Sequence, residues 1–137
     1  MSDPQGTGEQ GGETGLWPRS ALIDQPYLDV CRQSGVTPQR LLQMADVFEA
    51  QLAEDRLAML EAVEAGDLAR VQACAHRLKG SSGSLGLPVL RSHAARLEEA
   101  AKTGRTATCR TALGQLKEMG RITLQAFREA LWPLEMP

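Results

Sequence analysis

Apolar residues recur along most of this chain at the three- and four-residue spacings that give a helix one buried face. The longest run extends from residue 38 to about residue 65, and two more begin at Pro88 and near Thr106. The repeating positions of these runs are Leu41, Ala45, Phe48, Leu52, Met59 and Val63, then Leu90, Ala94, Leu97 and Ala101, then Ala112, Leu116, Met119 and Ala126. No stretch alternates apolar and polar residues as a half-buried strand does, so the pattern predicts an all-α fold.

Capping residues, glycines and prolines mark where these helices begin and end. Thr37–Pro38 offers a side-chain cap and a proline suited to the first helical position. Gly66 ends that helix and Asp67 can cap the next one. The other expected boundaries are Gly86, Pro88 and Gly104, with a last helix over Thr106–Trp132 that Pro133 stops. With a short helix over Pro26–Gln33, we expect an antiparallel up-down four-helix bundle with a short extra N-terminal helix.

Composition narrows the class of protein. Five glycines before residue 16, mixed with polar residues, predict a flexible tail over residues 1–16 and one helical domain over residues 17–137. The net charge is −2 and Lys and Arg are not clustered, which argues against nucleic acid as a partner. No apolar run approaches the roughly 20 residues that span a bilayer, so no membrane segment is expected. We expect a soluble, cytoplasmic protein.

Cysteine and histidine positions give no sign of a disulfide framework or a metal site. Cys31, Cys74 and Cys109 are odd in number and far apart, and we expect them to be reduced and largely buried. Cys74 and His76 point about 160° apart on a helix, so they are not expected to share a metal ion. His93 borders a core stripe and is expected to be a partly buried structural residue.

The helix expected over Asp67–Leu85 presents an exposed histidine. Its apolar stripe consists of Leu68, Val71, Ala75, Leu78, Ser82 and Leu85. At about 100° per residue, His76 lies roughly 130° from the centre of that stripe and should face solvent. Its helical neighbours are Ala69, Gln72, Ala73, Lys79, Gly80 and Gly83.

Four of these six neighbours are small, and one is a cation. A glycine inside a helix is about 1 kcal/mol less favourable than alanine, so Gly80 and Gly83 beside one exposed histidine need a reason. A clearing that admits the backbone of another protein is such a reason. Lys79 alone would be an ordinary solvated charge. Together, an imidazole nucleophile, a nearby cation and steric room are what phosphoryl transfer to histidine requires.

The run His76-Arg77-Leu78-Lys79-Gly80-Ser81-Ser82-Gly83-Ser84-Leu85-Gly86 resembles the signature of histidine phosphotransfer (HPt) domains. Gly66-Asp67 and Leu97-Glu98 also fall where that family usually has "GD" and "LE", and the resemblance covers roughly residues 25–130. It implies a four-helix bundle, a phosphohistidine at His76, Lys79 close to the phosphoryl group and Gly80 leaving it accessible. Leu87, where the family commonly has alanine, is a departure outside the reactive face.

The resemblance also implies partners and a monomeric bundle. An HPt-like protein relays a phosphoryl group between aspartates of response-regulator receiver domains, one of them within a hybrid histidine kinase. The chain lacks nucleotide-binding motifs, so we expect a phosphocarrier without kinase activity and without its own cofactor; Mg²⁺ would belong to the receiver domain. The partner would dock on Ala69, Gln72, Ala73, Lys79 and Gly83. The alternative is an adaptor of the same shape that docks on a receiver or kinase without carrying phosphate.

Overall fold

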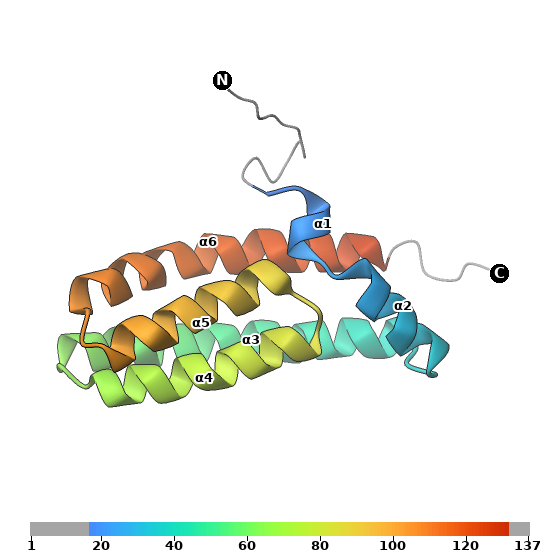
Figure 1. Ribbon diagram of the computed structural model, residues 1–137. Coiled ribbons are helices and arrows are strands. Elements are labelled where there is room, and N and C mark those ends of the chain that lie inside the picture. Colours follow the sequence, from blue (N-terminus) through green and yellow to red (C-terminus); the bar gives the residue numbers. More distant parts are fainter. Residues whose placement is uncertain (1–16, 132–137) are drawn as a thin grey trace, which may run out of the picture.

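The computed structural model describes residues 17–131, and every regular element within that range is a helix. The helices shown in Figure 1 are α1 Arg19–Leu22, α2 Gln25–Gln33, α3 Pro38–Glu64, α4 Leu68–Ser84, α5 Pro88–Lys102 and α6 Thr106–Ala130. The predicted all-α class is therefore confirmed. Within residues 17–131, no helix combines the length and the hydrophobicity that a membrane-spanning segment requires.

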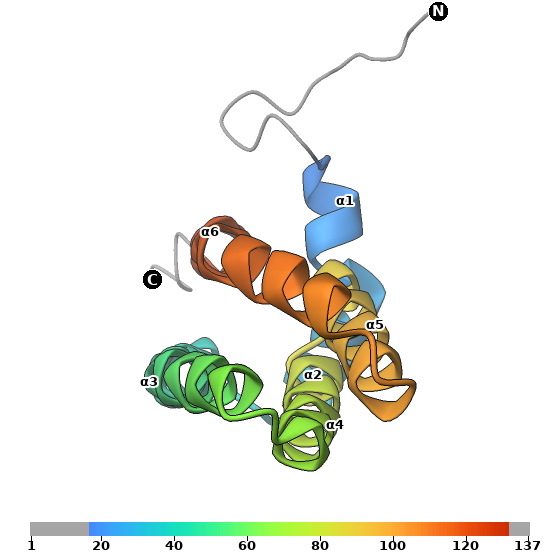
Figure 2. The same cartoon turned by 90° about the vertical axis from the view of Figure 1, so that its left-hand side faces the viewer.

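The long helices pack around one shared core. Helix α4 packs against α3 and α5, and α6 packs against the same two helices on the other side; Figure 2 shows the four of them end-on. Every apolar position predicted for α3, α5 and α6 is buried. In α4, Cys74 joins the predicted stripe, whereas Leu68 is only half-buried because it begins the helix at the end of the bundle.

The predicted caps and stops fix the ends of α4. The Asp67 carboxylate accepts a hydrogen bond from the Arg70 backbone N–H at 3.1 Å. Gly66 and Gly86 adopt φ values of 73° and 70°. These values lie in the left-handed region, which glycine adopts without the steric cost that other residues incur. The hydroxyl of Thr37 caps α3 in the predicted way, at 3.0 Å from the Arg40 nitrogen. These local interactions place His76 near the middle of α4.

The N-terminal region differs from its prediction. One short helix was expected from Pro26, but two are present, and α2 begins one residue earlier because the Asp24 carboxylate caps it through the Tyr27 N–H at 3.0 Å. Helix α1 is a single turn whose Leu22, with the following Ile23, is buried against α5 and α6. Such a short helix depends on tertiary packing rather than on propensity.

Two other expectations concern the chain ends. Helix α6 ends at Ala130, with Leu131 as its C-cap. The expected flexible tail over residues 1–16, and the expected end at Trp132 and Pro133, lie outside the described residues.

Candidate functional site

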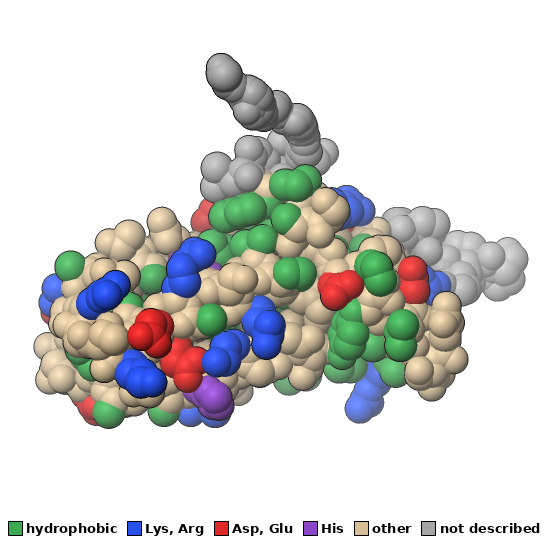
Figure 3. Space-filling view, in the orientation of Figure 1, with side chains coloured by type: hydrophobic (Ala, Val, Ile, Leu, Met, Phe, Trp, Pro, Cys, Tyr) green, Lys and Arg blue, Asp and Glu red, His purple; other side chains and the backbone are tan. Residues whose placement is uncertain are grey.

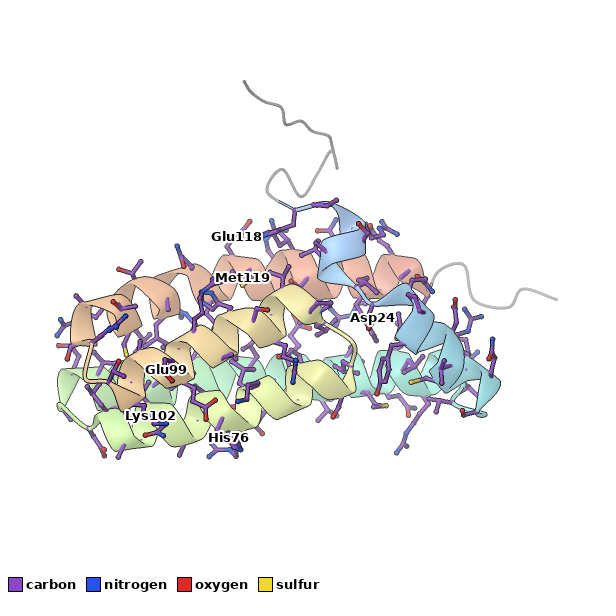
Figure 4. The ribbon with its side chains drawn as sticks, viewed as in Figure 1. Asp24, His76, Glu99, Lys102, Glu118 and Met119 are labelled. Atoms are coloured by element: carbon purple, nitrogen blue, oxygen red, sulfur yellow. The ribbon has the colours of Figure 1, made fainter. Side chains whose placement is uncertain are left out.

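His76 is exposed on the outer face of α4. Its side chain is 68% exposed, while Ala75 and Leu78 on either side of it are buried in the core. Figure 4 shows the imidazole projecting from α4 away from the bundle, and Figure 3 shows an exposed histidine surrounded by acidic and basic side chains. The orientation expected from the helical period is therefore confirmed.

A carboxylate from the neighbouring helix holds the imidazole. Glu98 of α5 lies with Oε2 at 2.8 Å from His76 Nδ1 and with Oε1 at 2.7 Å from Lys79 Nζ. Each of its two oxygens therefore contacts one of the two side chains of α4 that the sequence predicted for the site. Sequence reasoning noted Leu97-Glu98 only as part of a family pattern and did not place Glu98 in the site.

Glu98 is an ionised carboxylate in this setting. The hydrogen bond from Lys79 lowers the pKa of Glu98 below its ordinary value; partial burial opposes this shift and the contact with His76 reinforces it. Its side chain is 19% exposed, and that of Lys79 is 32% exposed. The ammonium group of Lys79 therefore forms an ion pair with the Glu98 carboxylate and is not an unpaired cation.

The carboxylate also selects the tautomer of the imidazole. An ionised carboxylate only accepts hydrogen bonds, so the Nδ1–H of His76 must donate to Glu98. In the neutral ring the lone pair is then on Nε2, the nitrogen on the far side of the ring from Glu98. The exposed nitrogen is therefore the nucleophilic one.

The small residues around His76 do not all form an open clearing. Ala69 and Ala73 are exposed, and a methyl group added at Gly80 would meet nothing within 4 Å. At Gly83, however, an added Cβ would lie 3.2 Å from Nε of Arg91, whose side chain crosses α4 there. The space expected beside His76 is therefore open at Gly80. At Gly83 the expectation was wrong, because the side chain of Arg91, which comes from α5, occupies that space.

The second histidine is part of the core. His93 is 1% exposed, more deeply buried than expected, and its Nε2–H donates to the Ala112 carbonyl at 2.8 Å. Burial lowers the pKa of His93, and nearby Arg96 acts in the same direction, although the bond to Ala112 opposes them. A neutral imidazole with this partner is a structural residue.

The cysteines are all free: Cys74 and Cys109 are buried and Cys31 is half-buried. Over residues 17–131, no group of three His, Cys, Asp or Glu side chains is arranged to hold a metal ion.

Comparison with known proteins gives one match. The family model described as the Hpt domain matches residues 43–130, which is more than half of the 137-residue chain. The matched segment contains His76, Lys79, Gly80 and Glu98. The curated proteins and the solved structures give no match.

Proposed function

This chain belongs to the Hpt domain family, whose members take part in histidine phosphotransfer in two-component signalling, and we propose that it relays phosphoryl groups through a phosphohistidine at His76. The observation that carries the proposal is the contact of Glu98 with both His76 Nδ1 and Lys79 Nζ, at 2.8 and 2.7 Å. That contact leaves Nε2 free on an exposed ring.

The proposed reaction uses this nitrogen as the nucleophile. The Nε2 lone pair forms a bond to the phosphorus of an aspartyl phosphate, and the bond from phosphorus to the aspartate oxygen breaks, with its electrons leaving on the carboxylate. The ring becomes a phosphorylated imidazolium whose Nδ1 proton stays on the hydrogen bond to Glu98. The negative carboxylate stabilises the positive charge that the ring gains.

Lys79 and Gly80 have complementary roles in the proposal. The ammonium group of Lys79, one helical turn from His76, offsets negative charge on the phosphoryl oxygens. Gly80 keeps the next position free of a side chain, so that the backbone of the donor can approach. Ala69, Gln72 and Ala73 are proposed contact residues, and so is Gly83, where the partner would also meet the Arg91 side chain that lies over it.

We propose a receiver domain and a hybrid histidine kinase as partners, with Mg²⁺ bound by the receiver. The chain would act as a cytoplasmic monomer, without ATP-binding or kinase activity of its own. We also propose that residues 17–137 form one domain in which α3–α6 make an antiparallel up-down bundle. The short connections over residues 65–67, 85–87 and 103–105 support that arrangement.

The test is phosphoryl transfer from a purified receiver domain. The chain is incubated with a phosphorylated receiver and Mg²⁺, and an acid-labile, alkali-stable adduct is measured. We expect label on the unaltered protein and on His93→Gln, and none on His76→Gln. His93→Gln is the matched control because His93 is the only other histidine.

The alternative function, a docking adaptor, makes a different prediction. An adaptor would bind a receiver but accept no label from any receiver or from phosphoramidate. Charge reversal by Lys79→Glu separates the two functions further: a carrier loses transfer rate at saturating receiver, whereas an adaptor loses only affinity.

A further inference from the structure

Arg91 of α5 lies across α4 at Gly83. A Cβ at Gly83 would be 3.2 Å from Nε and 3.3 Å from Cδ of Arg91, so the absence of a side chain at Gly83 makes room for the arginine. The backbone of Gly83 has ordinary helical geometry, so no turn requires glycine there. The glycine is explained by the side chain that passes over it.

The guanidinium of Arg91 has no counter-charge of its own. Arg91 is exposed, and its side chain forms no hydrogen bond or ion pair with any residue in the described range 17–131, although its backbone N–H donates to the Leu87 carbonyl at the start of α5. Lys79 on the same surface is paired with Glu98 at 2.7 Å. Arg91 therefore offers donors that the protein itself does not use.

Arg91 lies within reach of any protein that covers His76. Gly83 follows His76 by two helical turns, a distance of about 10 Å along α4. Even a small transient interface, on the order of 600 Å² per partner, corresponds to a circle about 14 Å in radius. A receiver domain centred on His76 would cover Arg91 as well, and a covered guanidinium needs an acceptor.

We propose that Arg91 is a specificity-determining residue that pairs with an acidic side chain on the cognate receiver domain. The planar guanidinium binds a carboxylate with two parallel hydrogen bonds, which makes the pair selective for position as well as for charge. A receiver that lacks an acid at this place would leave the guanidinium covered and unpaired, and would be rejected. This inference rests on the proposed function and names what the same site recognises.

Transfer kinetics with the full chain test the proposal. The rate of label transfer from a phosphorylated receiver is measured against receiver concentration for the unaltered protein, Arg91→Gln and Lys117→Gln. Lys117 is the matched control because it is an exposed cation in the groove between α3 and α6, the helices that carry neither His76 nor Glu98. We expect Arg91→Gln to raise KM about tenfold with little change in kcat, and Lys117→Gln to change neither.

Two further measurements separate docking from chemistry. Labelling by phosphoramidate should be the same in Arg91→Gln and the unaltered protein, because this small donor does not reach Arg91. Arg91→Glu should transfer poorly and regain activity when one acidic residue of the receiver is replaced by arginine. If both proteins transfer phosphate and Arg91→Gln has the same KM as the unaltered protein, the proposed role of Arg91 is wrong but the proposed function still stands. Absence of label on the unaltered protein would instead overturn the proposed function, and the role of Arg91 with it.

Discussion

At the scale of single residues, the chemistry proposed for the site depends on one carboxylate from a neighbouring helix. Glu98 contacts Nδ1 of His76 at 2.8 Å and so directs the lone pair to Nε2. Its other oxygen holds Lys79 close to the ring. A phosphoryl group on Nε2 would bring anionic oxygens that compete with Glu98 for Lys79. The ion pair between Lys79 and Glu98 is therefore expected to loosen when His76 is phosphorylated.

Replacing Glu98 by glutamine tests this role. The amide oxygen can still accept the Nδ1–H bond, but the negative charge that stabilises the imidazolium is lost. We expect transfer from a phosphorylated receiver to slow by about 10- to 100-fold at saturating receiver, less than for a fully buried triad carboxylate. Glu99→Gln is the control, since Glu99 is an exposed neighbour on α5 (Figure 4). Equal slowing in both variants would contradict a specific role for Glu98.

The buried histidine predicts how stability depends on pH. The pKa of His93 is lowered in the folded protein, mainly by burial, from the ordinary value of 6.5. Below pH 6.5 the unfolded chain binds a proton that the folded protein resists, so the free energy of unfolding should fall as the pH drops from 6.5 toward 5. It should be fully retained above pH 6.5. The slope for one proton is at most about 1.4 kcal/mol per pH unit.

His93→Gln isolates that contribution. Glutamine can keep a donor to the Ala112 carbonyl but does not titrate. Urea unfolding at pH 7.5, 6.5 and 5.5 should show a smaller loss of stability in the variant than in the unaltered protein. Parallel losses would mean that other groups cause the pH dependence in this range.

At the scale of secondary structure, α4 contains two glycines close to His76, and glycine inside a helix lowers the stability of that helix. Its outer face carries Gly80 and Gly83 in the C-terminal part of a 17-residue helix. The two glycines serve different purposes: space is left open at Gly80, and Arg91 occupies the space at Gly83. Hydroxyls of Ser81 and Ser84 donate to carbonyls one turn earlier, so these serines are satisfied within the helix.

Gly80→Ala should therefore separate stability from activity. The added methyl group meets nothing within 4 Å, and alanine is the better helix former, so we expect the protein to gain about 0.5–1 kcal/mol in urea unfolding. The same methyl group should obstruct a receiver backbone and slow transfer from it. Labelling by phosphoramidate serves as the internal control and should change little. A variant that is more stable and equally fast with a receiver would argue against the access role of Gly80.

At the scale of the whole molecule, close approach of distant segments holds the bundle together. Two short contacts fasten the N-terminal helices to the turn after α4: the Tyr27 hydroxyl donates to the Ser84 carbonyl, and the Asp24 N–H donates to the Gly86 carbonyl, both at 2.9 Å. Between α3 and α6, Gly120 faces Leu52 so closely that an added Cβ would lie 2.6 Å from Leu52 Cδ2.

The two glycines of α6 make a matched test of this packing. Gly120→Ala must displace Leu52, and the overpacking should outweigh the gain in helix propensity, giving a net loss of about 1 kcal/mol. Gly114→Ala, which meets nothing within 4 Å, should instead gain about 0.5–1 kcal/mol. Urea unfolding of both variants measures the contrast. Equal effects at the two positions would mean that α3 and α6 are not tightly packed at Gly120.

Local sequence patterns were enough to predict the helices and the part of the candidate site that lies on one of them. Helical period, caps and glycine stops act over a few residues, so the ends of α3, α4 and α5 could be predicted closely. His76, Lys79 and Gly80 are spaced three and four residues apart, and their common face followed from the period alone.

The side chains that reach this face from other helices could be identified only from the way the helices pack against one another. Glu98 on His76, Arg91 over Gly83 and the packed single turn of α1 all depend on how one helix is rotated and shifted against another. Core packing sets that rotation and shift through many contacts at once, and no local spacing encodes it. Leu97-Glu98 gave a partial signal, because the residue after a buried leucine lies at the edge of the buried face. No comparable pattern in the sequence indicated that Arg91 would lie over Gly83.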